Sequence, residues 1–132
     1  MAHSVQSPTF DLSNTYLHLE DGPSATLVPV DDDFWLAPDR LAIFGVGRLV
    51  GLFHMSDDWM QWEMHPDGDE IVYLVSGSIN FVLEHDDGER VIELRKGTTC
   101  VVPRGIWHRA LVHAPSEALH ITRGAGTQHR PI

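Results

Sequence analysis

Short runs of alternating apolar and polar residues recur along most of the chain. Successive side chains of a strand point to opposite faces of a sheet, so this alternation is typical of half-buried β-strands. No segment sustains an α-helical period over three turns. The pattern predicts strands at residues 25–30, 41–55, 59–65, 70–75, 78–84, 89–94, 98–102, 107–113 and 117–123. Many short strands at regular spacing indicate an all-β sandwich or barrel.

Turn residues separate these runs. Asp86-Asp87-Gly88 carries the Asp-Gly signature of a tight hairpin, and Arg95-Lys96-Gly97 closes another turn. Three glycines within residues 41–55 indicate bends or bulges in that strand.

The flanking segments carry weaker patterns. Residues 1–40, interrupted by prolines, are expected to form an N-terminal arm that packs on a barrel of residues 41–123. Within the arm, the apolar cluster Phe34-Trp35-Leu36 is expected to plug one end of the barrel or cover a sheet face, because large apolar groups are usually buried. Residues 124–132 are expected to be a loosely held C-terminal tail. We expect one domain overall.

Composition excludes several classes of partner. The 132 residues suit one hydrophobic core, and the net charge of −10 argues against nucleic acids and anionic membranes. The single cysteine, Cys100, cannot form an intramolecular disulfide, and its apolar setting predicts a buried, unreactive thiol. No apolar stretch approaches the length of a membrane span, and residues 1–7 lack the pattern of a secretory signal. We therefore expect a cytoplasmic protein.

Two stretches gather residues with metal-binding or acid-base chemistry. In the first, strand alternation places Gln61, Glu63 and His65 on one face, and a Pro-Asp-Gly turn brings Glu70 beside His65. In the second, a strand, a Pro-x-Gly turn and a further strand lead to His108. Gln61 is expected at the mouth of the pocket that these residues would line.

These two stretches resemble the two motifs of the cupin family. The first motif has the form H-x-H, three or four residues, E, six residues, G. The second has the form G, five residues, P-x-G, two residues, H, three residues, N. The chain departs from them at Glu63, in place of the first histidine, and at Val112, in place of the asparagine. The matching residues are His65, Glu70, Gly77, Gly97, Pro103, Gly105 and His108.

The resemblance implies a fold and a metal site. It implies a double-stranded β-helix, the jelly-roll barrel of cupins, over roughly residues 41–123. It also implies that His65, Glu70 and His108 bind a divalent metal, with Glu63 in the fourth ligand position. Two imidazoles and two carboxylates suit manganese, iron or zinc. Glu63 and Glu70 are also the candidate catalytic groups of a dioxygenase or isomerase acting on a small organic molecule.

Two other functions remain open. A cupin that has lost part of the ligand set would bind a small molecule without metal or catalysis. A metal-free acid-base enzyme, of the sugar-nucleotide epimerase type, would use the same imidazoles and carboxylates. The sequence shows no basic cluster suited to a diphosphate, which disfavours the epimerase. His54 and His120 are expected to be exposed or hydrogen-bonded rather than part of the site.

The outer face of the expected barrel is rich in apolar groups. Alternation places Trp62, Met64 and Trp107 there, with Arg109 also pointing outward. Such a surface needs a cover, so we expect a homodimer, or burial under the N-terminal arm.

Overall fold

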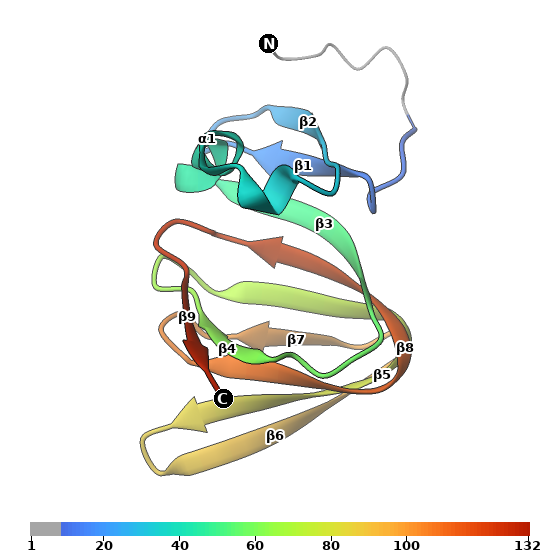
Figure 1. Ribbon diagram of the computed structural model, residues 1–132, viewed down its shortest axis with the longest axis vertical. Coiled ribbons are helices and arrows are strands. Elements are labelled where there is room, and N and C mark those ends of the chain that lie inside the picture. Colours follow the sequence, from blue (N-terminus) through green and yellow to red (C-terminus); the bar gives the residue numbers. More distant parts are fainter. Residues whose placement is uncertain (1–8) are drawn as a thin grey trace.

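The computed structural model describes residues 9–132, and within them nine β-strands form one antiparallel fold (Figure 1). Two 3₁₀ turns and one short helix connect the first strands. The strands are β1 (Thr15–Leu19), β2 (Ala25–Pro29), β3 (Arg48–Met55), β4 (Gln61–Met64), β5 (Glu70–His85), β6 (Gly88–Arg95), β7 (Thr99–Val102), β8 (His108–Thr122) and β9 (Gln128–Pro131). The helical elements are η1 (Phe34–Leu36), α1 (Pro38–Leu41) and η2 (Ala42–Gly45).

The two long strands β5 and β8 are the frame of the barrel. They pair with each other along most of their length, and β5 also pairs with β6 and β7 while β8 pairs with β3 and β4. The all-β barrel expected from the sequence is confirmed. Each long strand covers two of the predicted strands, because strand pairing continues through residues 76–77 and 114–116, where the apolar pattern is interrupted.

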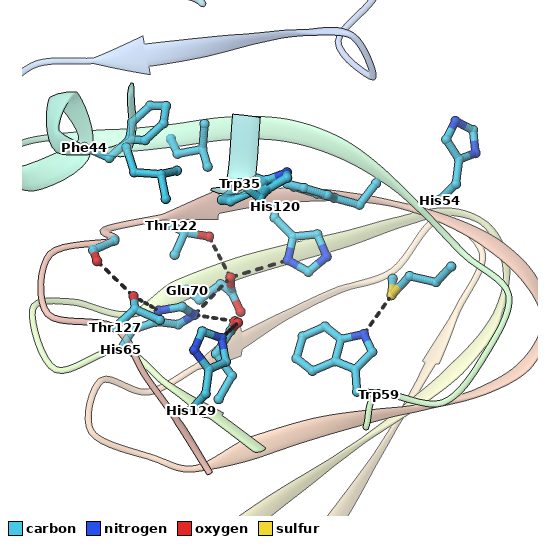
Figure 2. A pocket seen from close by; sticks show the side chains of 16 residues that line it. Trp35, Phe44, His54, Trp59, His65, Glu70, His120, Thr122, Thr127 and His129 are labelled. Atoms are coloured by element: carbon cyan, nitrogen blue, oxygen red, sulfur yellow. Dashed lines mark hydrogen bonds and ion pairs between the residues drawn. The ribbon is translucent and has the colours of Figure 1, made fainter. Parts of the chain in front are cut away.

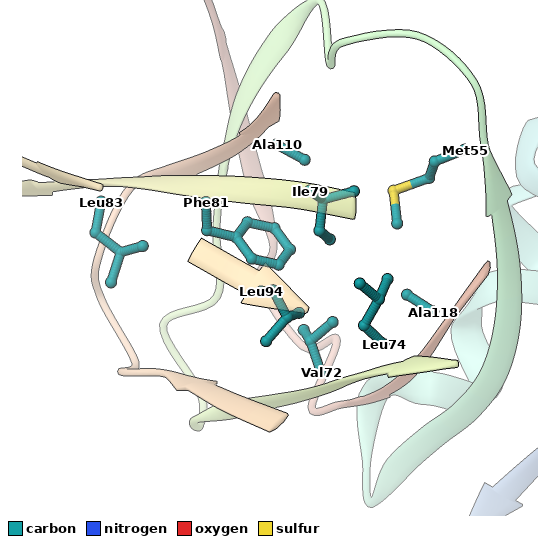
Figure 3. Close-up of a cluster of buried hydrophobic side chains, with 9 residues drawn as sticks. All are labelled: Met55, Val72, Leu74, Ile79, Phe81, Leu83, Leu94, Ala110 and Ala118. Atoms are coloured by element: carbon teal, nitrogen blue, oxygen red, sulfur yellow. The ribbon is translucent and has the colours of Figure 1, made fainter. Parts of the chain in front are cut away.

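Gly77 marks the bend in β5. Its φ of +95° is a conformation that favours glycine, and the pairing of β5 with β8 shifts register between Leu74 and Ile79. A register shift exchanges the two faces of a strand. Even-numbered residues face the interior before the bend and odd-numbered residues after it, which builds one continuous core (Figure 3). The core comprises Met55, Val72, Leu74, Ile79, Phe81, Leu83, Leu94, Ala110 and Ala118.

The N-terminal residues add a layer to one end of the barrel (Figure 1). β1 pairs with both β2 and β3, so it extends the barrel sheet. Its Tyr16 packs with Phe34, Phe44 and Leu49 in a second apolar cluster. Residues 1–8 of the expected arm lie outside the described residues.

The predicted strand at residues 41–55 is correct only from Arg48 onward. Residues 38–45 are helical, because Pro38 occupies the first helical turn, where its fixed φ is favourable. Leu41 and Phe44, three positions apart, then face the same side. An apolar run of this length fits either a strand or a short helix, so the pattern alone did not separate the two.

The expected loose tail is instead a strand. β9 pairs in antiparallel register with β4, from Gln61 opposite Pro131 to Met64 opposite Gln128. The short polar run Gln128–Pro131 has no apolar alternation, so its pairing could not be predicted locally. As a consequence, Gly124, Thr127 and His129 line the cavity of the functional site.

The outer-face residues Trp62 and Trp107, expected to need a second subunit or the N-terminal arm as a cover, are covered by arginines of the same chain. Trp62 is 6% exposed, and the guanidinium groups of Arg109 and Arg130 stack on its ring at 5.1 and 5.2 Å. Arg130 also stacks on Trp107. In residues 9–132 no helix has the length and apolar character needed to cross a membrane.

Candidate functional site

Two turns bring the candidate ligands together. The turn after β4 is fastened to the Pro-x-Gly turn by Gly105 N–H donating to the His65 carbonyl at 2.9 Å. Arg104 N–H donates to Asp69 Oδ1, also at 2.9 Å. On the neighbouring strands, Glu63 lies directly opposite His108. These contacts place residues from β4, β5 and β8 around one point.

Four side chains converge at this point. Glu63, His65, Glu70 and His108 each offer one ligand atom, and the four atoms lie within 4.8 Å of one another. His65 Nε2 is 2.9 Å from Glu63 Oε1 and 3.4 Å from Glu70 Oε2. His108 Nε2 is 3.3 Å from Glu70 Oε1. The structure therefore brings together the whole ligand set expected from the sequence.

The outer nitrogen of each imidazole is held by an oxygen. Thr127 Oγ1 donates its proton to the Gly124 carbonyl, so it accepts from His65 Nδ1–H at 2.8 Å. His108 Nδ1–H donates to the Ile106 carbonyl at 3.0 Å. Both rings are fixed in the orientation that turns Nε2 toward the cluster, as is typical of metal-binding histidines.

The carboxylates are held in the same way. Glu70 Oε2 accepts from the Thr122 hydroxyl at 2.6 Å and from His120 Nδ1–H at 3.4 Å. Glu63 Oε2 accepts from His129 Nε2–H at 2.9 Å. One oxygen of each carboxylate is thus engaged outside the cluster, and the other points into it.

The inner atoms fit a divalent metal ion. In the described part of the chain, His65 Nε2, Glu70 Oε1 and His108 Nε2 are buried and have no aligned hydrogen bond. Unpaired buried polar atoms are costly, and three of them at one point indicate a missing partner. Two imidazole nitrogens and two carboxylate oxygens are ligands that manganese, iron and zinc accept.

The imidazoles and carboxylates of the cluster shift one another's pKa values. Burial opposes ionisation of Glu70, but contacts with the imidazoles of His108, His120 and His65 hold its pKa well below the usual range. Burial also opposes the charge on His65, but contacts with Glu63 and Glu70 raise the pKa of His65 to about 9. Burial disfavours the Glu63 carboxylate as well, and His65 nevertheless lowers its pKa. Both carboxylates are therefore ionised at neutral pH.

Three members of the cluster, Glu63, His65 and Glu70, form the floor of a cavity of about 720 Å³ (Figure 2), and His108 lies buried behind them. Aromatic and aliphatic side chains from the N-terminal layer and β3 form its upper wall, including Trp35, Phe44 and Phe53. His129 and Thr127 lie beside His65 at the opposite wall. A volume of this size accommodates a small organic molecule.

Of three other residues considered in the sequence analysis, only His54 lines this cavity, whereas Gln61 and Cys100 lie outside it. Gln61 is exposed and lines a smaller depression beside Glu63 and His129. His54 lies at the exposed end of the main cavity. Cys100 is partly buried outside it, and burial together with the charge of Glu70 raises the pKa of its thiol to about 11.

Sequence reasoning missed Thr122, Thr127 and His129. It expected His120 to be exposed or hydrogen-bonded, and His120 is hydrogen-bonded to Glu70 but also lines the cavity. His120 and Thr122 follow Ala118 at strand alternation, so the buried face of β8 could have indicated both. Thr127 and His129 had no such signal, because their roles depend on the pairing of β9 with β4. In the Phe34-Trp35-Leu36 cluster, only Phe34 is buried in the core, whereas Trp35 is half exposed on the cavity wall.

Comparisons with known proteins agree with this geometry. The family described as "Cupin domain" matches residues 55–122. A search of curated protein sequences gave no significant match. Among solved structures, a cupin-2 domain protein from Shewanella frigidimarina is 21% identical, with a TM-score of 0.50 over 57% of this chain and 69% of that one. Protein NMB1881 from Neisseria meningitidis is 24% identical, with a TM-score of 0.50 over 57% of this chain and 72% of that one.

A larger protein shares the barrel as well. Oxalate decarboxylase from Bacillus subtilis is 18% identical, with a TM-score of 0.54 over 64% of this chain and 24% of that one. At these identities the structural likeness shows the fold alone. The family match spans more than half of the chain and contains His65, Glu70 and His108. The chain therefore belongs to the cupin family.

Proposed function

We propose that this cupin binds a divalent metal ion through Glu63, His65, Glu70 and His108 and acts on a small organic molecule in the cavity above it. The reaction would be of the dioxygenase or isomerase type. The observation that carries the proposal is the convergence of four ligand atoms within 4.8 Å, with three of them buried and lacking an aligned hydrogen bond. A bound divalent ion would act there as a Lewis acid toward a substrate oxygen.

The chain's own residues would prepare the site in three ways. Thr127 and the Ile106 carbonyl keep the Nδ1 protons of His65 and His108 in place, so each Nε2 lone pair faces the centre. Thr122 and His129 hold the outer carboxylate oxygens. The mainly apolar walls would lower the dielectric constant around the floor and so strengthen the electrostatic interactions there.

The donor set favours a hard or borderline ion. Oxygen ligands suit manganese, and mixed imidazole and carboxylate sets suit iron and zinc. The oxalate decarboxylase with the same barrel is described as having Mn(II) centres. Manganese, iron and zinc are therefore the ions to test first.

A metal-free, ligand-binding cupin is the second candidate. One observation favours it: His65 lies between Glu63 and Glu70, and its positive charge partly compensates theirs without a metal. In that case the cavity would bind a small molecule and the chain would perform no chemistry. The two candidates differ in whether a divalent ion binds.

Metal analysis and calorimetry separate them. Protein purified without chelators or a metal-affinity step should contain close to one divalent ion per chain. Metal-free protein should bind Mn²⁺, Fe²⁺ or Zn²⁺ with micromolar or tighter affinity, and His65→Ala should abolish this binding. Glu63→Gln should weaken it by a factor on the order of 10 to 100, as loss of a ligand or its partner does.

His113→Ala is the matched control, because His113 is exposed on β8 and outside the cluster. It should bind metal like the parent. If the parent binds none of the three ions at micromolar concentration, the metal proposal is wrong and the ligand-binding candidate replaces it. If Glu63→Gln binds as tightly as the parent, Glu63 is not a ligand.

A further inference from the structure

The walls of the cavity carry an unusual combination of groups. Among the described residues that line it there is no lysine or arginine. Its floor contains the two ionised carboxylates of Glu63 and Glu70, which would balance the charge of a divalent ion. A carboxylate or phosphate ligand therefore finds no lysine or arginine to pair with. The charge of His65 is already engaged by Glu63 and Glu70, and these two carboxylates repel an anion.

The rest of the lining is mainly apolar. Trp35 from η1, Phe44 from η2 and Phe53 from β3 contribute aromatic surface, and Trp59 faces them across the cavity (Figure 2). Trp35 is 49% exposed, which is large for an indole on a concave wall. Aromatic and aliphatic surface of this kind favours a ligand with a ring or another apolar body.

One polar atom beyond the metal cluster is unsatisfied. His120 is 6% exposed, lines the cavity and packs edge-on against Phe53 at 5.1 Å between ring centroids. Its Nδ1–H donates to the Glu70 carboxylate, so its Nε2 carries a lone pair. Within the described residues this Nε2 is buried and has no hydrogen-bond partner. A buried acceptor at a ligand cavity indicates that the ligand supplies the donor.

We infer that the cavity binds an uncharged, mainly apolar small molecule that carries a hydroxyl group, and that His120 Nε2 accepts the hydrogen bond from that hydroxyl. This inference deepens the proposed function by naming the class of ligand, and it relies on that function only for the cavity the two share. His120 is then a ligand-binding residue, positioned by Glu70. Oxalate-like dianions are excluded as ligands, even though a protein with the same barrel is named for oxalate.

Three matched probes test the ligand class by calorimetry. They are 4-ethylphenol, its methyl ether 4-ethylanisole, and the anion 4-ethylbenzoate. Metal-free and metal-loaded full-length protein should both bind 4-ethylphenol about 10-fold more tightly than 4-ethylanisole, the expected effect of one buried hydrogen bond. 4-Ethylbenzoate should bind more weakly than either. Failure to bind 4-ethylphenol, or tighter binding of 4-ethylbenzoate, would overturn the inference.

Substitutions at His120 test the role of its ring. His120→Asn keeps a donor at the position of Nδ1, next to Glu70, but lacks Nε2. It should lose about 10-fold in affinity for 4-ethylphenol and leave that for 4-ethylanisole unchanged. His120→Gln, whose amide oxygen reaches further, should restore part of the preference. Equal losses for both probes would show a structural role and contradict the assignment.

Two further variants complete the design. Trp35→Ala should weaken the binding of 4-ethylphenol and of 4-ethylanisole by the same factor, because the substitution removes apolar contact surface and no hydrogen bond. His113→Asn, at an exposed position of the same strand, should change neither. Metal titration of the same protein separates the two proposals. If the parent protein binds no metal but still prefers 4-ethylphenol, only the metal site is disproved. If it binds metal but does not prefer 4-ethylphenol, only the ligand class is disproved.

Discussion

At the scale of single residues, the site depends on side chains that would not themselves touch a metal. Thr127 accepts from His65 Nδ1–H only because its own proton is donated to the Gly124 carbonyl. His129 similarly occupies the outer oxygen of Glu63. The imidazole and the carboxylate are thereby fixed before any ion arrives, which reduces the cost of ordering them on binding.

Replacement of Thr127 should weaken metal binding without unfolding the protein. Thr127→Val keeps the shape of the side chain but cannot accept from His65, so the ring is free to rotate. We expect metal affinity to fall by a factor on the order of 10 to 100, measured by calorimetry on metal-free protein. Thr127→Ser should retain parent affinity. Parent-like binding by Thr127→Val would show that the hydroxyl does not position the ring.

The sequence could predict the inner ligands but not their supports. His65, Glu70 and His108 lie at motif spacings, and strand alternation alone placed Glu63 beside His65. Thr127 and His129 belong to a polar segment without periodicity, so only the folded sheet shows where they lie. His120 could have been found from alternation along β8, but a histidine on a strand is more often a hydrogen-bonded structural residue.

At the scale of elements, the bend in β5 determines which residues form the core. A Cβ atom added to Gly77 would lie 2.6 Å from Ser116 Cα and 2.7 Å from the Pro115 carbonyl oxygen, both of them backbone atoms. Neither atom can move aside without moving β8. Glycine is therefore required at this position by its φ angle and by the closeness of the neighbouring strand.

Gly77→Ala should be strongly destabilising. Backbone strain at positive φ costs about 1–3 kcal/mol, and the clash with β8 adds to it. We expect a loss of about 3 kcal/mol or more in the free energy of unfolding, measured by urea denaturation. Gly97→Ala is the matched control, since Gly97 has a similar φ of +84° but nothing within 4 Å of the added Cβ. Equal losses in the two variants would show that the contact with β8 is unimportant.

Elements whose identity follows from local pattern were predicted, and those that follow from pairing were not. The hairpin at Asp86-Asp87-Gly88 joins β5 to β6 as expected, because an Asp-Gly turn is a local signal. The predictions for residues 38–45 and for the C-terminal tail were wrong. The apolar run that includes Leu41 fits either a strand or a short helix, and the polar run of β9 has no pattern that predicts a strand. β1 was not predicted as a strand, because its five residues lie in a mainly polar segment between Pro8 and Pro23.

At the scale of the whole molecule, the cavity lies between the barrel and the N-terminal layer. The metal ligands come from the barrel, whereas Trp35, Leu41 and Phe44 come from the layer. The chemistry of the floor and the shape of the upper wall thus belong to different parts of the chain. Ligand preference could change through the layer while the metal centre stays intact.

The homodimer remains a prediction, but the surface expected to form the interface changes from that around Trp62 to the outer face of β5 and β7. Trp62 is covered by two arginines, but Ile71 and Tyr73 on β5 are each 37% exposed, and Val101, which pairs with Ile71, is 52% exposed. A two-fold pair is the commonest way to bury such a sheet face. Light scattering at micromolar concentration should give twice the chain mass, and Val101→Lys should give the mass of one chain. Val91→Lys, on the exposed β6, is the control. A parent protein that already has the mass of one chain would contradict this prediction.

The pairing of β4 with β9 determines when the site can form during folding. His65 and Glu70 lie across a single turn, whereas Glu63 and its partner His129 are 66 positions apart. Contacts between such distant positions form late, because chain closure is entropically unfavourable until both strands are in place. A partly folded chain would therefore hold the ion poorly. The ion would select the finished barrel and stabilise it by mass action, and it would not act as the nucleus around which the barrel folds.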